Sequence, residues 1–357
     1  DTTRSWFSIS ISYTGQYQTA TTSQTLGNIW SSSDYGVTWS TRGSTGAYRH
    51  VSVSSTGQYQ TVATFNSTLF TSSDYGINWI ARDSTRNWQS VSLSSTGQYQ
   101  TAVVNNGQIH ISSDYGNTWT SINVYTSNNL NTYITSVSLS ETGQYQTVTA
   151  NELTVFISND YGNTWIKNID IGNTKVFVSV SLRGQYQIVL SCGDSFYYSD
   201  NYGLTWTRYD DEESDLYNSI QTFPTGGVSM SFTGQYQVIV SESIYISNDY
   251  GTTWNNAFQN DKFNDHNWIG VSISSDARIM TAIDNGGCIY NSQNYGVTWA
   301  PILLKSVKNK LWRAISISAD ANFQTAIEDG GTVYYSQDYG TTWEITSDQK
   351  MFGKNWI

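Results

Sequence analysis

Acidic side chains are the most plentiful groups in this sequence that could do chemistry: 28 Asp and Glu residues stand against 17 Lys and Arg, giving a formal net charge of −11. Two carboxyl groups facing each other across a cleft can hydrolyse a glycosidic bond. Most of the Asp residues, however, recur at one fixed place in a repeated motif, where we expect a structural role. The conspicuous remainder is the run Asp210, Asp211, Glu212, Glu213 and Asp215. This run lacks the glycine and the spacing of an EF-hand, so we expect a solvated acidic loop, with a Ca²⁺ site there as the less favoured alternative.

Histidine and cysteine, the other common ligands and nucleophiles, are few and scattered. His50, His110 and His266 fall in different repeats with no second His or Cys at ligand spacing, which argues against zinc. Cys192 and Cys288 occupy non-equivalent positions in two repeats, so we predict two free, buried thiols in preference to a disulfide. The sequence therefore predicts no catalytic residue and no cofactor, while a glycoside hydrolase with a carboxylate pair stays open as an alternative.

The motif that absorbs most of the Asp residues is Ser-x-Asp-Tyr-Gly-x-Thr-Trp, first seen at Ser32–Trp39 and repeated at intervals of 40 to 48 residues. Two of its eight copies have Asn in place of Asp, which can still accept a hydrogen bond and tolerates turn geometry. The acidic or amide position is held by Asp34, Asp74, Asp114, Asp160, Asn201, Asp249, Asn294 and Asp338. The closing position is held by Trp39, Trp79, Trp119, Trp165, Trp206, Trp254, Trp299 and Trp343.

The third copy shows why this motif suits a tight hairpin. Gly116 permits a positive φ, the Asp114 carboxylate can accept backbone N–H bonds inside the turn, and Trp119 can pack down on the strands. We therefore interpret the motif as a folding device repeated eight times.

A second signature precedes each copy and is clearest over residues 90–102, where Ser and apolar residues alternate before a Thr-Gly turn and a Gln-Tyr-Gln-Thr-Ala run. Alternation with period two indicates a strand with two unlike faces. In the third repeat we predict strands at residues 90–94, 99–104, 108–112 and 118–122, which form a four-stranded antiparallel meander. Such a unit cannot bury its apolar face alone, and stacking around an axis solves this.

The motif, as in Ser112–Trp119 and Ser247–Trp254, resembles the Asp-box or BNR repeat of sialidases, sortilin-type receptors, some glycoside hydrolases and photosystem-assembly factors. The resemblance implies a β-propeller but no particular activity, because unrelated functions share this fold. The sialidase members of this group use an arginine cluster and an Arg-Ile-Pro motif. No Arg-Ile-Pro occurs here, and neither Pro224 nor Pro301 follows an Arg-Ile pair, so we do not expect sialidase activity.

We therefore predict an all-β chain: one eight-bladed β-propeller of four-stranded antiparallel blades with Asp-box hairpins, and seven blades plus an extra repeat as the alternative. Residues 351–357 are either the start of a ninth unit or a tail that helps close the ring. The predicted repeats cover approximately residues 4–43, 44–83, 84–124, 125–170, 171–210, 211–258, 259–303 and 304–350.

Insertions lengthen four of the stretches between successive repeats: residues 121–135, 209–226, 255–267 and 301–310. In a propeller these connections emerge on one face, and loops on a rigid scaffold commonly carry binding residues. Aromatic rings among amides and hydroxyls suit sugar stacking or a protein interface, although such loops can simply cap the blade ends. The candidate binding residues are Tyr125, Tyr217, Phe223, Phe258, Phe263 and His266.

The acidic balance argues against a nucleic-acid partner, because phosphate binding needs clustered Lys and Arg, and no apolar run is long enough to span a membrane. We predict a non-catalytic recognition or structural propeller that binds a glycan or a protein through the face bearing the insertions. The composition favours an extracellular, virion-surface or cell-surface location. An intracellular assembly factor is the other alternative.

Overall fold

The computed structural model describes most of the chain. The described residues are 4–22, 27–105, 107–124, 134–150, 154–170, 176–191, 195–209, 211–212, 214–222, 226–258, 266–302 and 310–346.

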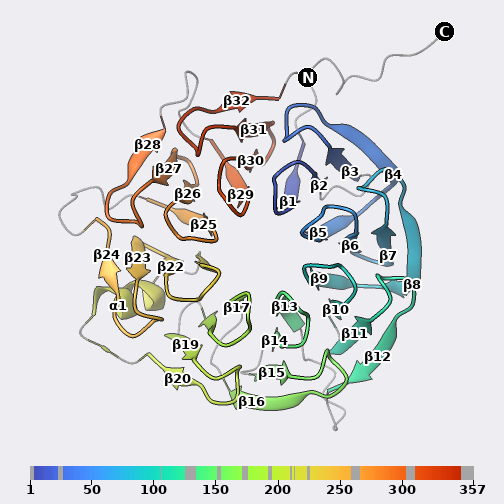
Figure 1. Cartoon of the computed structure of the whole chain (residues 1–357), viewed down its shortest axis with the longest axis horizontal. Coiled ribbons are helices and arrows are strands. Elements are labelled where there is room, and N and C mark those ends of the chain that lie inside the picture. The colour runs from blue at the N-terminus through green and yellow to red at the C-terminus, as the bar shows by residue number, and fades with distance from the viewer. Residues whose placement is uncertain are drawn as a thin grey trace.

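The described residues form eight antiparallel sheets of four strands each, arranged as blades around a central axis (Figure 1), which confirms the predicted eight-bladed propeller and not the seven-bladed alternative. Each blade is one uninterrupted stretch of chain, and its strands run outward from the axis in sequence order.

The innermost strands are β1 (Trp6–Ile11), β5 (Tyr48–Val53), β9 (Trp88–Leu93), β13 (Ile134–Leu139), β17 (Val176–Val180), β21 (Gly227–Met230), β25 (Trp268–Ile273) and β29 (Trp312–Ile317). The second strands are β2 (Gln18–Thr22), β6 (Gln60–Thr64), β10 (Gln100–Val104), β14 (Gln146–Ala150), β18 (Gln187–Ser191), β22 (Gln237–Val240), β26 (Met280–Asp284) and β30 (Gln324–Glu328). The third strands are β3 (Gly27–Ser32), β7 (Ser67–Ser72), β11 (Gln108–Ser112), β15 (Thr154–Ser158), β19 (Ser195–Ser199), β23 (Ile244–Ser247), β27 (Ile289–Ser292) and β31 (Val333–Ser336). The outer strands are β4 (Ser40–Gly46), β8 (Ile80–Arg86), β12 (Thr120–Asn123), β16 (Ile166–Asp170), β20 (Thr207–Arg208), β24 (Asn255–Asn256), β28 (Ala300–Ile302) and β32 (Glu344–Ile345).

This chain order gives the propeller two unlike faces. The turn between the first and second strands and the Asp box between the third and fourth lie on one side, which we call the Asp-box face. The turn between the second and third strands and the links from blade to blade lie on the other side, which we call the connection face. Sequence repetition is strongest on the Asp-box face.

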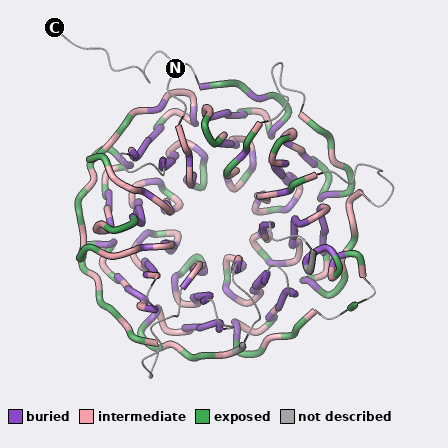
Figure 2. The backbone as a smooth tube through the Cα atoms, turned by 180° about the vertical axis from the view of Figure 1, so that it is seen from behind, coloured by how far each residue is buried: buried purple, intermediate pink, exposed green. Residues whose placement is uncertain are grey.

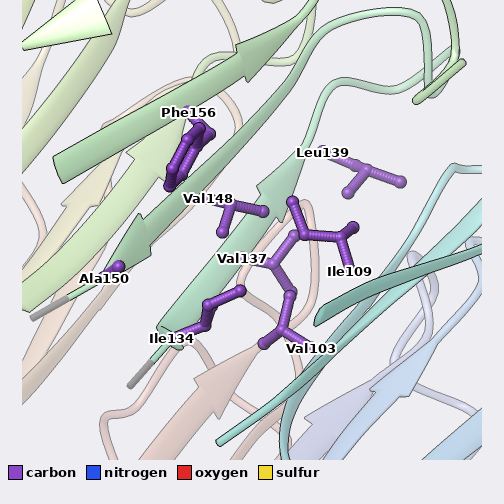
Figure 3. Close-up of a cluster of buried hydrophobic side chains, with 8 residues drawn as sticks. All are labelled: Val103, Ile109, Ile134, Val137, Leu139, Val148, Ala150 and Phe156. Atoms are coloured by element: carbon purple, nitrogen blue, oxygen red, sulfur yellow. The ribbon is translucent and has the colours of Figure 1, made fainter. Parts of the chain in front are cut away.

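The core lies between neighbouring blades. Figure 3 shows one cluster in which Val103 and Ile109 of the third blade pack against Ile134, Val137 and four other buried residues of the fourth blade. The second strands are buried almost throughout, whereas the outer strands face solvent (Figure 2). Burying both faces of the middle strands explains their continuous Val, Ile and Ala content.

A ring of backbone hydrogen bonds joins all eight blades on the Asp-box face. Each bond runs from an N–H after one innermost strand to the corresponding carbonyl of the next blade, with N···O distances between 2.7 and 3.2 Å. The donor and acceptor pairs are Tyr13–Ser55, Ser55–Ser95, Ser95–Glu141, Glu141–Leu182, Leu182–Phe232, Phe232–Ser275, Ser275–Ala319 and Ala319–Tyr13. The last pair closes the ring without a strand shared between the two ends of the chain.

A second device joins the blades through buried side chains. The Thr of the Gln-Thr pair donates its hydroxyl to the Gln amide oxygen of the next blade, as from Thr61 to Gln100 at 2.5 Å and from Thr325 to Gln18 at 2.6 Å. The same Gln donates its amide to the preceding turn, as from Gln100 to the carbonyl of Gly97 at 2.9 Å. These paired bonds explain why a polar Gln-Thr pair is kept in a buried strand.

Rings stack between blades directly above this ladder. Tyr59 lies 4.4 Å from Tyr115 of the next blade, and equivalent aromatic pairs occur at six other blade interfaces. At the remaining interface Ile279 takes the aromatic position, and Arg278 lies over the Tyr339 ring instead, 5.5 Å from its centroid.

The insertion at 209–226 differs from the loop that the sequence predicts, because it contains a helix, α1 (Asp215–Thr222). Leu216 and Ile220 on this helix are buried against Phe196 and Tyr245 of the fifth and sixth blades. Ser214 caps the helix by accepting the N–H of Tyr217 at 3.1 Å. An amphipathic pattern of only eight residues is easily missed beside so strong a β-repeat.

Candidate functional site

Each Asp box is a closed hydrogen-bonded turn. In the third blade, Ser112 donates its hydroxyl to Asp114 Oδ1 at 2.8 Å and accepts the N–H of Gly116 at 2.9 Å. Thr118 donates its N–H and its hydroxyl to the two carboxylate oxygens at 2.9 and 2.7 Å. The Trp119 indole donates to the carbonyl of Gly116 at 3.1 Å, which fixes the ring against its blade.

The turn places two consecutive residues in the left-handed region. Gly116 has φ of +80°, and Tyr115 before it has φ of +64°. The sequence identified the glycine but gave no reason to expect a tyrosine there. The stacking of Tyr115 on Tyr59 of the preceding blade accompanies this strained conformation.

The hydrogen bonds shift the acidity of the Asp-box carboxyl groups. Partial burial raises the pKa of Asp114, but the bonds from Thr118, Ser112 and Asn117 outweigh it, and the net pKa is below the usual value. The pKa values of Asp74, Asp160, Asp249 and Asp338 are lowered in the same way. These carboxylates are held ionised inside their own turns and are not poised as general acids.

The two Asn-containing boxes keep the same geometry. Asn201 Oδ1 accepts the N–H of Thr205 at 2.9 Å, and its amide donates to the Thr205 hydroxyl at 2.7 Å. Asn294 makes the equivalent pair of bonds with Thr298 at 2.9 Å each. In both Asn boxes the side-chain NH2 group takes the place of one carboxylate oxygen. This group donates a hydrogen bond to the Thr hydroxyl, which therefore accepts where it donates in the Asp boxes.

The connection face differs from the Asp-box face. A β-bulge recurs there at the start of most innermost strands, but the side chain at the bulge differs from blade to blade. In six blades the innermost strand shifts register just after its first residue, which is Trp6 in the first blade. A β-bulge leaves the extra residue out of the ladder and re-aims its side chain. The residues at these bulges are Phe7, Arg49 with His50, Gln89, Thr135, Ile269 and Arg313.

Four of these bulge residues come from consecutive blades and form two pairs, each across a blade interface. The Arg313 guanidinium of the eighth blade lies over the Phe7 ring, 4.7 Å from its centroid. Arg49 of the second blade donates to Gln89 Oε1 of the third at 2.5 Å and lies 4.6 Å from the centroid of Phe65. Arg49 is partly buried, and this desolvation lowers its pKa.

Between Phe7 and Arg49 the connection face is hollowed into a pocket of about 580 Å³. Its walls come from Phe7 in β1, from Tyr48 and Arg49 at the start of β5, and from the turn that carries Phe65. Phe65 is 41% exposed, although it is a large apolar side chain. A pocket lined by three aromatic residues and a guanidinium is the strongest candidate binding site among the described residues.

The sequence missed this pocket because its residues lie outside the four insertions. A signal was available: five innermost strands begin with an aromatic residue, and the residue that follows it varies from blade to blade inside an otherwise repetitive segment. Phe7, Arg49, Gln89 and Arg313 could have been found by that comparison alone.

Three of the six predicted binding residues, Tyr125, Phe223 and Phe263, lie outside the described residues. Tyr217 is half-buried on α1, and the structure does not bring it together with Phe258 and His266, the other two described candidates. Phe258 and His266 do lie together, with ring centroids 6.2 Å apart, and both pack on Trp268. Their rings are committed to this aromatic cluster and do not form an open stacking surface.

His266 also belongs to a polar pair on the connection face. Its Nδ1 lies 2.6 Å from Asp284 Oδ2, and Asp284 Oδ1 accepts the N–H of Asn267 at 2.8 Å. Asp284 is therefore fully engaged in holding the start of β25.

The other two histidines lie elsewhere. His110 lies 2.8 Å from Asp83, and burial of its ring lowers its pKa to about 4. His50 is half-buried in β5, where its Nδ1 lies 3.1 Å from the carbonyl oxygen of Val91, so the three histidines have separate surroundings.

The acidic run is only partly described. Asp211 and Glu212 are exposed just before α1, while Asp210 and Glu213 lie outside the described residues.

Cys288 is a free, half-buried thiol whose pKa is raised by burial and by nearby Asp284, and Cys192 lies outside the described residues. Within the part of the chain that the structure describes, no three His, Cys, Asp or Glu side chains are grouped so that they could hold a metal ion. Nor does any helix in that part have the length and apolar character needed to cross a membrane.

Comparisons with known proteins agree with the repeat and the fold. A family model of the BNR-Asp box repeat matches residues 69–81, which cover β7 and the Asp box of the second blade. A search of curated protein sequences found no match.

Among solved structures, the fold is similar to YCF48 from Cyanidioschyzon merolae, with a TM-score of 0.56 and 14% identity over 96% of this chain and 97% of that one. It is similar to YCF48 bound to D1 peptide, with a TM-score of 0.58 and 13% identity over 94% of each chain. It is also similar to the GH74 xyloglucanase from Xanthomonas campestris, with a TM-score of 0.51 and 11% identity over 94% of this chain and 66% of that one.

At these identities the likeness extends to the fold alone. One motif match, eight Asp boxes with one shared geometry and a closed ring of eight sheets agree with one another. The chain is an eight-bladed β-propeller built from Asp-box, or BNR, repeats.

Proposed function

We propose that this chain is a non-catalytic recognition propeller that binds a segment of another protein on its connection face, with the pocket of Phe7, Arg49 and Phe65 as the central contact. The observation that carries the proposal is the β-bulge that recurs in six innermost strands with a different side chain in almost every copy. If the fold required a particular side chain at the bulge, the same residue type would recur in every blade together with the bulge. Variation at a constant backbone position is what recognition of an irregular ligand requires.

The chemistry of the pocket favours a protein ligand. Aromatic residues and arginine are enriched at the centres of protein interfaces, where they are held in partly desolvated pockets. Arg49 is positioned by Gln89 and Phe65, so little side-chain entropy remains to be lost on binding. Within the described residues neither Arg49 nor Arg313 forms an ion pair, and both can meet an acidic group of the ligand.

The carboxyl groups support a binding role more than a hydrolytic one. Asp284 and Glu328 on the connection face are each held by a neighbouring base, His266 at 2.6 Å and Lys310 at 2.9 Å. A structurally similar chain, YCF48, has been solved with a peptide bound, which fits a propeller that takes a protein ligand. An extracellular or particle-surface location remains part of the proposal and rests on composition.

The first test is selection of binding peptides from a displayed random library, followed by affinity measurement with fluorescently labelled peptides. We expect the substitutions Arg49→Gln and Phe65→Ala each to weaken binding about tenfold or more, the effect of losing an interface centre. Val297→Ala is the matched control, because Val297 is an apolar side chain 74% exposed in the seventh Asp box, on the opposite face.

The outcomes separate the rival functions. Peptides that lose affinity with both pocket variants and keep it with the control support the proposal. Failure to select any peptide, or selection of peptides indifferent to Arg49 and Phe65, would overturn it. Binding of a glycan array that depends on the same two residues would replace the protein ligand by a carbohydrate.

A further inference from the structure

A second pocket of about 290 Å³ lies at the outer edge of the Asp-box face, between the first and second blades. Its lining includes the hydroxyl residues Ser31, Ser33 and Ser40, the Arg42 side chain and Ile77 of the next blade. Arg42 stands in β4, three residues after the Asp-box Trp39. Its Nε is buried and has no hydrogen-bond partner among the described residues.

In the second blade, the arginine at the equivalent position has hydrogen-bond acceptors for its donors. Arg82, three residues after Trp79, donates its Nε to Thr71 Oγ1 at 3.2 Å. It also donates Nη2 to Asn117 Oδ1 of the third blade at 2.9 Å. Asn168 in the fourth blade likewise donates to the carbonyls of Gly203 and Leu204 of the following blade at 2.8 and 2.9 Å. In these two blades, a polar side chain at this position therefore donates to the next Asp box.

Both partners have changed around Arg42. Ser31 takes the place of Thr71, and its hydroxyl donates to the carbonyl of Gly76 at 3.2 Å. Ile77 takes the place of Asn117 and offers no acceptor. The carboxylate of the first Asp box, Asp34, is turned into its own hairpin, where it accepts bonds from Ser32, Thr38 N and Thr38 Oγ1 at 2.9, 2.9 and 2.6 Å.

Arg42 is only half-buried, but its Nε is a buried donor, and leaving such a donor unpaired is costly, so native structures normally supply a partner. We propose that this pocket binds an oxyanion, with Arg42 as its cationic anchor and the hydroxyls of Ser33 and Ser40 as further donors. A guanidinium fork matches two oxygens of a carboxylate, phosphate or sulfate group, which defines the ligand class. The site is independent of the protein-binding pocket at Phe7, which lies on the other face.

Of the two changed positions around Arg42, Ile77 is the one that can be altered without disturbing the core. Ile77 is 53% exposed, so its apolar side chain adds little to the core and is free to vary. Replacing Ile77 by Asn would give Arg42 the acceptor that Asn117 gives Arg82, and the guanidinium would no longer need an external anion. This makes Ile77→Asn a variant that closes the site without touching the cation.

The test is equilibrium dialysis of the full chain against radiolabelled sulfate, phosphate and acetate, each measured separately at constant ionic strength. We expect saturable binding of one anion per chain. Arg42→Gln should weaken it at least tenfold, Ile77→Asn should weaken it about tenfold, and Arg82→Gln should leave it unchanged, because Arg82 already has protein acceptors. The midpoint of denaturant unfolding shows whether each variant keeps its fold.

The three anions distinguish the sources of the ligand. Preference for sulfate or phosphate indicates a tetrahedral anion, and preference for acetate indicates the carboxylate of an organic acid or an acidic side chain. No saturable binding of any of the three, or binding that a folded Arg42→Gln variant retains, would overturn the proposal. Loss of binding in Arg82→Gln to the same extent would overturn it too, since the site would then not be confined to the first two blades.

Discussion

At the scale of single residues, the Asp boxes show how a short polar motif holds a turn with its own side chains. Asp114 accepts three hydrogen bonds from Ser112 and Thr118, and each is worth about 0.5–1.5 kcal/mol net. Asn201 and Asn294 show that the amide can take over the role of the carboxylate when the Thr hydroxyl reverses its bond. The motif thus requires an acceptor for the Thr N–H and not a charge.

We therefore expect Asp114→Ala to lower the free energy of unfolding by about 1–2 kcal/mol, because it leaves the turn donors unpaired, and Asp114→Asn to cost much less. Urea denaturation at neutral pH measures both. Equal losses for the two variants would contradict the reading that an acceptor, and not its charge, is required.

The lowered pKa values of Asp74, Asp114, Asp160, Asp249 and Asp338 also predict a pH dependence. A carboxyl group whose pKa is lower in the folded state stabilises the protein above its unfolded pKa of about 3.9, and this stability is lost as pH falls through the folded pKa. We expect the wild-type unfolding midpoint to fall below about pH 4. A chain with these five Asp residues changed to Asn should show a shallower fall, and an identical pH profile would refute the assignment.

At the scale of the elements, most interfaces between blades are joined by the hydrogen bond from a buried Thr to the Gln of the next blade, which we call the Thr–Gln ladder. Two interfaces lack this bond. Val238 of the sixth blade faces Met280 of the seventh, so both members of the polar pair are replaced by apolar ones at that interface. Between the fifth and sixth blades only the Thr is replaced, by Ile188, and Gln237 Oε1 is left buried without a hydrogen bond among the described residues.

This pattern predicts that Thr61→Val will lower the free energy of unfolding by about 1–3 kcal/mol, because it strands the buried amide oxygen of Gln100. Adding Gln100→Met copies the natural Val238–Met280 pair and should recover part of the loss. A double-mutant cycle by urea unfolding measures the coupling. A double variant as unstable as the sum of the single ones would show that the ladder is not a paired unit.

At the scale of the whole molecule, ring closure depends on contacts that no covalent link supports. The eighth blade meets the first through the Ala319–Tyr13 backbone bond, the Thr325–Gln18 bond and a bond from the Trp6 indole to the carbonyl of Gly331 at 3.2 Å. Arg4 lengthens the contact by a β-bridge to Gly331. These are the same kinds of bond that join the other blades, where a peptide link also holds the neighbours together.

We expect the closing interface to open first, because its two blades are not tethered at that point. Trp6→Phe removes the indole donor but keeps an aromatic ring, and hydrogen exchange should then become faster at the amides of Ala319 and Gly330. Trp88→Phe removes the equivalent bond to the carbonyl of Ser67 and serves as the control. Equal acceleration of exchange at both interfaces would indicate that tethering contributes nothing to closure.

Most of the fold follows from the sequence because the information is local and repeated. Alternating Ser and apolar residues, the turn glycines and the Asp boxes each specify their element within a few residues. The strands predicted for the third repeat agree with β9 to β12 to within about two residues. The helix α1 was missed because tertiary packing of Leu216 and Ile220 defines it more than any local signal does.

The candidate sites depend on the tertiary structure for a different reason. Phe7, Arg49 and Phe65 are far apart in the chain, and only the bulges and the packing of the first two blades bring them around one pocket. The Arg42 site likewise depends on what the following blade offers at Ile77. Sequence by itself determined the repeat, its count and its turns, since each is set by neighbouring residues. Which side chains meet across blades was decided by the closed ring, because its geometry places residues some 40 positions apart in contact.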